Sequence, residues 1–170
     1  MENFNLSLLH VIEQHQAWGP FIIGLLAFGE SLAIVSLLIP ATFVMLALGG
    51  LIGLGGLDLM PFCIGASIGA FLGDVVSYEI GRHYGPRVLK LWPLKNYPDL
   101  FKQAQAFFRR WGLLGIVGGR FIGPLRAFIP LSAGIAHMPR GPFLLVDFLS
   151  APLWAVVLLA PGAIGLAALG

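Results

Sequence analysis

Apolar residues run almost without interruption along most of the chain, and charged residues break this pattern at only a few positions. Residues 20–57 make up 38 residues with a single charge, Glu30. As one continuous helix this segment would be about 57 Å long, whereas the hydrocarbon core of a bilayer is about 30 Å thick. We therefore expect the segment to fold back on itself, with Pro40 as the breaking point.

The residues around Pro40 predict a turn that is buried inside protein. The sequence LLIPATF carries no charge and no cluster of turn-forming polar residues, which a turn exposed to water normally has. Membranes tolerate irregular backbone only where protein shields it, so the pattern predicts a re-entrant helical hairpin. Residues 62–81 follow as a predicted membrane span, rich in small residues that permit close contact between helices.

The second half of the chain repeats this behaviour over residues 111–139. These residues are mostly apolar, and ionisable side chains interrupt them at only three positions, Arg120, Arg126 and His137. Pro124 and Pro130 are expected to break the segment into a second hairpin. Residues 142–160 are predicted to form a last span, which ends at Pro161-Gly162.

The two halves match at an offset of 90 residues. The matching pairs are Gly29-Glu30 with Gly119-Arg120, Ile39-Pro40 with Ile129-Pro130, and Thr42 with Ser132. We interpret the match as an internal repeat, although glycine and proline are common in this chain and a coincidence would give the same pairs.

The composition is that of an integral membrane protein. Hydrophobic residues make up 58% of the chain and charged residues 11%, against about 25% charged residues in a soluble domain. The single cysteine, Cys63, excludes a disulfide scaffold, and the apolar fraction excludes intrinsic disorder.

No cleavable signal peptide is expected, because the first apolar run follows Glu2 and Glu13 rather than basic residues. Residues 1–19 instead predict a short amphipathic helix at the membrane surface.

The charges are distributed unevenly along the chain. Residues 1–81 hold six acidic residues and no lysine or arginine, whereas residues 82–110 hold seven basic residues and one acidic residue. Because this basic segment lies between apolar segments, the positive-inside rule predicts that it is cytoplasmic, and nucleic-acid binding is not expected. The first hairpin then enters the membrane from the outer face and the second from the inner face. Transporters with such inverted repeats bind their substrate near the midplane.

The predicted protein is therefore an all-α, multi-pass protein of a bacterial inner membrane, an inverted repeat of a re-entrant hairpin plus a transmembrane helix. Its predicted segments are an amphipathic interfacial helix (1–19), the first repeat (20–81), a basic cytoplasmic segment (82–110) and the second repeat (111–170).

Charged residues inside the apolar segments are the main candidates for function. They are Glu30, Asp74, Arg120 and Arg126. Each costs roughly 2.5–3.5 kcal/mol at the centre of a membrane helix, so a charge without a purpose is not expected there. One interpretation is two structural ion pairs that hold the hairpins together. The other is a midplane site where two guanidinium groups bind an anion such as phosphate, and the carboxylates carry a proton or compete with the anion.

Other chemistries find little support in the sequence. The histidines, at positions 10, 15, 83 and 137, lack the spacing of metal ligands, so neither a metal nor another cofactor is expected. No nucleophile has a base nearby in the sequence, which argues against an enzyme.

One block of residues resembles a known family. The sequence GRFIGPLR at 119–126, followed by FIPLSAG at 128–134, resembles the signature of the bacterial DedA family, which is related to eukaryotic VTT-domain lipid scramblases. Further matching positions are Glu30, Gly73, Asp74, Tyr78, Gly81, Arg82, Gly85, Met138, Phe143, Ala151 and Trp154. The resemblance covers about residues 20–162. It implies re-entrant hairpins, transport of undecaprenyl phosphate or phospholipid head groups and, in some members, dependence on the proton gradient.

The chain departs from the family pattern in its acidic residues. Pro40-Ala41-Thr42 lacks the acid that the family usually has in the first hairpin, so proton coupling through a carboxylate pair is in doubt and Thr42 offers only a hydrogen bond. Asp147 replaces the usual asparagine of the last span; its role is open, and one interpretation puts it in water near the inner interface. Family members also commonly continue into a further helix.

Two functions follow as hypotheses. The first is a transporter that moves a lipid phosphate between leaflets, with the membrane lipid bound by Arg120, Arg126, Glu30, Asp74, Thr42 and Ser132. The alternative is a proton-coupled carrier of a small ion or drug, with Glu30 and Asp74 as proton sites. A scaffold without transport activity would need no buried charges. The sequence leaves open the lipid, the coupling ion and whether the chain forms a homo-oligomer.

Overall fold

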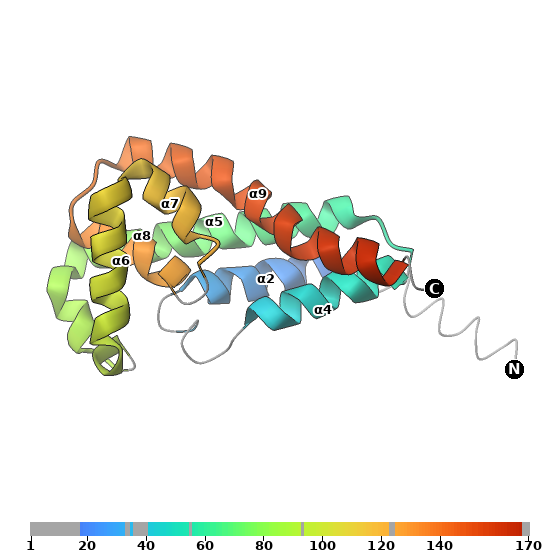
Figure 1. Cartoon of the computed structure of the whole chain (residues 1–170), viewed down its shortest axis with the longest axis horizontal. Helices are drawn as coiled ribbons and strands as arrows, with labels where there is room; N and C mark the ends of the chain where they lie inside the picture. Colours follow the sequence, from blue (N-terminus) through green and yellow to red (C-terminus); the bar gives the residue numbers. More distant parts are fainter. Residues whose placement is uncertain are drawn as a thin grey trace, which may run out of the picture.

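The computed structural model describes residues 18–32, 35, 41–54, 56–92, 94–122 and 125–167, and every regular element in these ranges is helical (Figure 1). The all-α prediction is therefore confirmed for this part of the chain. The predicted helix at 1–19 lies outside the described residues except for its last two positions, and Pro40 and Pro124 lie outside them as well.

Two long helices, α5 (Leu59–Tyr84) and α9 (Arg140–Ala167), run through the molecule in opposite directions (Figure 1). The 3₁₀ helix η1 (Gly85–Lys90) extends α5 at its C-terminal end. At the N-terminal end of α5, Asp58 caps the helix by accepting a hydrogen bond from the backbone N–H of Met60 (3.0 Å). Within the described ranges, the segments Leu59–Lys90 and Arg140–Pro161 are the two helical stretches long and apolar enough to cross a bilayer.

The helices α2 (Gly19–Ser31) and α4 (Ala41–Leu54) form a short antiparallel pair (Figure 1). With 13 and 14 residues, each is about 20 Å long, which is less than the roughly 30 Å of a hydrocarbon core. The first half of α5 carries a row of glycines, Gly65, Gly69 and Gly73. A Cβ atom on any of them would overlap a backbone carbonyl of α2, so these glycines let the two helices approach closely. As a result α2 ends beside Gly73, near the middle of Leu59–Lys90.

A second group of short helices follows α5. It consists of the 3₁₀ helix η2 (Leu94–Asn96), the helices α6 (Pro98–Trp111) and α7 (Leu113–Gly119), and α8 (Leu125–Ile135). Amphipathic α6 lies across one end of the molecule and buries Ala104 (Figure 1). Gly112 has a positive φ of 55°, which suits glycine, and makes the turn from α6 into α7. The pair α7–α8 opens toward the opposite end from the pair α2–α4 (Figure 1).

The two halves of the chain interlock. The long helix α5 contacts α2 from its own half and α8 from the other half, while α9 contacts α7 from its own half and α4 from the other. The crossing of α8 over α5 is close because Gly81 and Gly134 each face the backbone of the opposite helix. The buried apolar residues accordingly form two clusters. One contains Tyr78 and Phe128, the other Ala66 and Trp154.

One prediction about prolines is wrong, because Pro130 lies inside α8 instead of at a break. Pro161 lies inside α9, whose helix continues to Ala167, although the stretch of α9 that is long and apolar enough to cross a bilayer ends at Pro161. A proline removes a single backbone hydrogen bond, and helices in membrane proteins tolerate this loss where neighbouring helices support them.

Candidate functional site

The four charged residues predicted inside apolar segments are all buried, with 3–5% of their surface exposed. Glu30 lies in the last turn of α2, Asp74 in α5, Arg120 directly after α7 and Arg126 in the first turn of α8. They therefore gather where the short helices end and the long helices pass. Their burial and proximity agree with a central site, and their role in binding a substrate stays a prediction.

Arg126 is held by contacts from three directions. Its Nη1 atom lies 3.3 Å from Glu30 Oε1, and its Nη2 atom donates a hydrogen bond to Ser31 Oγ (2.9 Å). The guanidinium carbon lies 4.0 Å from the centre of the Trp154 ring in α9, a cation–π contact. The end of α2 and the start of α8 thus meet at Arg126. Ser77 Oγ of α5 donates to the Ser31 carbonyl (2.9 Å) and fixes this junction to α5.

Arg120 connects the two long helices. Its Nη2 atom donates hydrogen bonds to Asp74 Oδ2 of α5 and to Asp147 Oδ1 of α9, and all three side chains are at most 4% exposed. The interpretation of Asp147 as a residue in water near the inner interface is therefore wrong. The position of Asp147 along α9 turns its side chain toward α5 and Arg120 instead of toward solvent.

The charges of this cluster do not balance. Three carboxylates face two guanidinium groups in surroundings that exclude water, where each ion loses several kcal/mol of hydration unless its partners compensate. Around Arg120, the buried atoms Asp74 Oδ1, Arg120 Nη1 and Asp147 Oδ2 have no hydrogen-bond partner among the described residues. The Arg120 guanidinium therefore keeps a donor that a further acceptor, such as a phosphate oxygen, can use.

Two other predicted site residues are not brought to the cluster by a described contact. Ser132 is buried in α8, and its Oγ atom makes no hydrogen bond with the described residues. Thr42 belongs to the first turn of α4, and its side chain lies outside what the structure describes. Among the described residues, no group of histidine, cysteine and acidic side chains has the arrangement of a metal site.

Three residues of the cluster were not predicted as site residues: Ser31, Asp147 and Trp154. Ser31 follows Glu30 directly, so its position at the end of the broken segment was the available signal. Asp147 is the only acidic residue of the last span, which is the same signal that identified Glu30 and Asp74. Trp154 matched the family pattern, but its residue type gave no signal of a site, because a tryptophan in a membrane helix can equally face lipid.

Several of the remaining motif residues hold α5 against the segment after α8. Tyr78 Oη donates a hydrogen bond to the Met138 carbonyl, and Arg82 Nη1 donates to the same carbonyl and to Tyr78 Oη (both 2.9 Å). The Tyr78 ring also stacks on Phe143 of α9, with 4.2 Å between the ring centres. These contacts indicate a structural role for this part of the motif.

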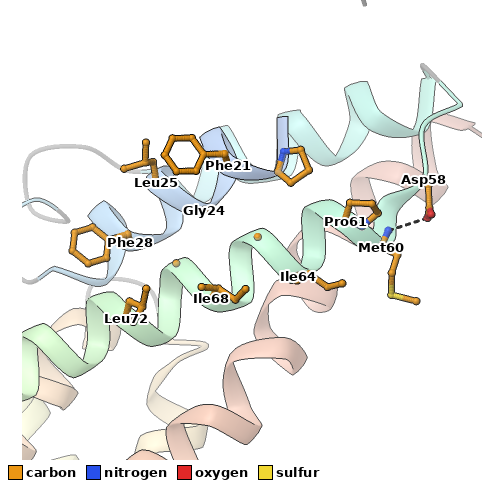
Figure 2. Close-up of a pocket in the computed structure, with 13 residues that line it drawn as sticks. Phe21, Gly24, Leu25, Phe28, Asp58, Met60, Pro61, Ile64, Ile68 and Leu72 are labelled. Carbon is orange, nitrogen blue, oxygen red and sulfur yellow. Dashed lines mark hydrogen bonds between the residues drawn. The ribbon is translucent and has the colours of Figure 1, made fainter. Parts of the chain in front are cut away.

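An apolar groove of about 690 Å³ lies between α2 and α5 (Figure 2). Phe21, Leu25 and Phe28 line it from α2, and the α5 side includes Ile64, Ile68 and Leu72. Asp58 is its one charged lining residue, at the end where α5 begins (Figure 2). The groove is separate from the charged cluster, since Leu72 is 48% exposed whereas Asp74, two residues further along the helix, is buried.

Comparison with known proteins identifies the family of this chain. The model of the VTT domain matches residues 39–164, about three quarters of the sequence. The chain belongs to the VTT-domain family. This result confirms the resemblance drawn from the GRFIGPLR sequence. The matched range contains Asp74, Arg120, Arg126 and Asp147, while Glu30 precedes it.

Similar proteins are named as membrane proteins. The inner membrane protein YabI of Escherichia coli K12 is 32% identical over 163 residues, which cover 95% of this chain and 64% of YabI. An uncharacterized membrane protein of Buchnera aphidicola from Acyrthosiphon pisum is 34% identical over 155 residues, covering 91% of this chain and 60% of that protein. The chain thus spans about three fifths of the length of these relatives. No solved structure matches the chain.

Proposed function

We propose that this VTT-domain protein is a transporter that moves a lipid phosphate, either undecaprenyl phosphate or a phospholipid, between the leaflets of a bacterial inner membrane. The observation that carries the proposal is the pair of buried arginines, Arg120 and Arg126, at the junction of α2, α5, α8 and α9. The charged phosphate is the part of a lipid that costs the most free energy to move through the hydrocarbon core. A planar guanidinium group that stays charged is suited to bind it by two parallel hydrogen bonds.

The arrangement of the short helices supports a pathway to these arginines from either side. The pairs α2–α4 and α7–α8 open toward opposite ends of the molecule (Figure 1). In each pair one helix packs on the long helix of the other half, α4 on α9 and α8 on α5. We infer that the two pairs are re-entrant hairpins of an inverted repeat around α5 and α9, both of which cross the membrane. Opening of one hairpin at a time would expose the arginines first to one leaflet and then to the other.

The acidic partners of the arginines suggest how binding would lead to movement. Glu30 belongs to α2, Asp74 to α5 and Asp147 to α9, so each carboxylate contact also joins an arginine to a different helix. A phosphate that replaces one of these carboxylates would therefore release one contact between helices. The same exchange leaves the arginine paired with an anion throughout, which avoids an uncompensated charge in the apolar interior.

The proposal is tested with the purified protein in liposomes. Movement of undecaprenyl phosphate and of an ordinary phospholipid between leaflets is compared for the wild type and for Arg126→Gln. We expect the variant to insert normally and to lose transport, because glutamine cannot replace the charge. The matched control is Arg109→Gln, which removes an exposed arginine of α6 and should leave transport unchanged. Wild-type transport rates in Arg126→Gln would contradict the proposal.

A second candidate function is a proton-coupled carrier of a small ion or drug. The excess of three buried carboxylates over two guanidinium groups favours it, since a carboxylate in such surroundings is suited to take up a proton. This function predicts transport that follows the pH gradient and is lost in Glu30→Gln. Lipid movement without a pH gradient, together with activity in Glu30→Gln, would exclude it.

A further inference from the structure

The charge excess of the buried cluster can be assigned to one part of it. Among the described residues, Arg126 has one acidic contact, with Glu30, at 3.3 Å. Arg120 contacts two aspartates, Asp74 and Asp147, and it does so through the same nitrogen atom, Nη2. With all of these groups ionised, the Arg120 group would carry one net negative charge while 4% or less of each side chain is exposed.

The two aspartates have the geometry of a coupled acidic pair. Asp74 and Asp147 each offer one oxygen to Arg120, while the other oxygens, Asp74 Oδ1 and Asp147 Oδ2, are buried and have no hydrogen-bond partner among the described residues. Two carboxylates that share one cation in a site closed to water seldom ionise together, because each repels the charge of the other. One added proton removes the excess negative charge. It also gives one of the two unpartnered oxygens a bonding partner.

We propose that Asp74 and Asp147 form a proton-binding site in which the two carboxylates share one proton. The proton comes from water and bonds to a carboxylate oxygen of one aspartate, which becomes a neutral carboxyl group. The other aspartate stays ionised and is paired with Arg120. The site thus joins α5 and α9 as a neutral unit.

The charged groups around this site come from the helices that pack against α5 and α9. Asp74 faces Asp147 from α5, and Arg120 faces it from the end of α7. Helix α4, which also packs against α9, contains no titratable residue in its sequence, and α8 brings Arg126 against Trp154 of α9. Beyond this group lie Glu30 and Arg126, which pair with each other. A change in protonation of the cluster can therefore be followed at a small number of groups.

The proton site also has a consequence for transport, which rests on the proposed function. When the pair holds its proton, one ionised carboxylate competes with a lipid phosphate for Arg120. When the proton leaves, two carboxylates hold Arg120 and repel the phosphate. Protonation would therefore favour phosphate binding, so that lipid movement increases as the pH falls and a proton enters the site together with the lipid.

The test is infrared spectroscopy of the full chain in liposomes at neutral pH. We expect a carbonyl band from a protonated carboxyl group that shifts in heavy water and shifts again when the aspartates carry an isotope label. The isotope label distinguishes aspartate from Glu30. The band should be lost in Asp147→Asn, an isosteric change, and kept in the control Asp99→Asn, which alters an exposed aspartate of α6.

Each outcome decides the proposal. A wild-type protein without a labelled aspartate band, or a band that persists in folded Asp147→Asn, would overturn it, and the wild-type measurement does not depend on any variant folding. A band that disappears in Asp147→Asn supports it. Liposome transport measured across pH then separates the two proposals. A wild type that shows the band but moves no lipid refutes the transport function alone, whereas transport that keeps its pH dependence in Asp147→Asn refutes the link between proton and lipid.

Discussion

At the scale of single residues, the buried arginines are positioned by contacts of different kinds. Arg126 combines an ion pair, a neutral hydrogen bond and an aromatic ring, from Glu30, Ser31 and Trp154. Arg120 depends on two aspartates alone among the described side chains. An arginine with one acidic partner and a flat aromatic support can exchange that partner without leaving its position. We therefore regard Arg126 as the residue on which a phosphate binds first.

The contact with Trp154 leads to a prediction at this scale. Trp154→Leu removes the ring beneath the Arg126 guanidinium, and a desolvated cation–π contact is worth about 2 kcal/mol. We expect slower lipid transport because the guanidinium loses its orientation. Trp154→Phe keeps an aromatic ring and serves as the matched variant, with a smaller loss of transport. The liposome assay compares the three proteins. Equal rates in Trp154→Leu and the wild type would mean that the ring only fills space.

The sequence was most informative where a charge interrupts an apolar segment. Glu30 and Asp74 were identified by this signal, and so were Arg120 and Arg126, because an ion in a membrane helix is costly enough to require a reason. The contacts of Asp147 could not be predicted in the same way. It lies near the start of the last span, and only the rotation of α9 about its own axis decides whether such a residue faces water or a neighbouring helix.

At the scale of helices, glycines set how closely α2 approaches α5. Pro20 and Gly24 of α2 present backbone carbonyls to Gly65 and Gly69 of α5, and Gly73 faces both the Phe28 carbonyl and the Ser31 side chain. This contact fixes where Glu30 and Ser31 lie along the axis of α5 relative to Asp74. The small residues of the 62–81 segment were correctly interpreted as a sign of close helix contact. The partner helix could not be predicted, because small residues carry no information about what lies opposite them.

Gly73→Ala tests this role of the glycines. The new Cβ atom would lie 2.5 Å from the Phe28 carbonyl oxygen and 2.6 Å from Ser31 Cβ, so α2 must move away from α5. We expect the free energy of unfolding to fall by about 1–3 kcal/mol, as in other overpacked sites, and transport to fall with it. Thermal unfolding in detergent measures the first effect. Gly141→Ala in α9 is the control, since no atom lies within 4 Å of the new Cβ atom there, and unchanged stability in Gly73→Ala would contradict the packing argument.

Proline was a poor guide to where helices end. Pro130 and Pro161 both lie inside helices that neighbouring elements support. The match of Pro40 with Pro130 at an offset of 90 residues consequently pairs a position just before α4 with one in the middle of α8. Length was the better signal, because a segment of 38 residues is longer than one crossing requires, and the structure divides it into the two short helices α2 and α4.

At the scale of the whole molecule, the interlocked halves explain how a chain of this size can enclose a polar site. Each long helix is covered by one short helix from its own half and one from the other half. The charged cluster lies where these layers meet, so neither half can bury it alone. Most of the basic residues of the 82–110 segment lie at the end of the molecule formed by η1, η2 and α6, opposite the end where α5 begins (Figure 1).

This arrangement predicts which positions are accessible from each side of the membrane. In a Cys63→Ala background, Asp58→Cys should react with an impermeant thiol reagent from outside, and Trp111→Cys only after the inner face is exposed. Val35→Cys, between α2 and α4, should react from neither side if the pair is re-entrant, because the turn stays shielded by protein. Reaction of Val35→Cys from the cytoplasm, at the rate of Trp111→Cys, would show instead that the pair crosses the whole membrane.

We propose above all that the buried arginines recognise the phosphate of a lipid. The most direct measurement compares movement between leaflets of undecaprenyl phosphate and of the corresponding alcohol, which has the same hydrocarbon chain and no phosphate, in liposomes with wild-type protein or Arg126→Gln. We expect the wild type to move the phosphate and not the alcohol, and the variant to move neither. Equal movement of both lipids by the wild type, or of the phosphate by the variant, would contradict it.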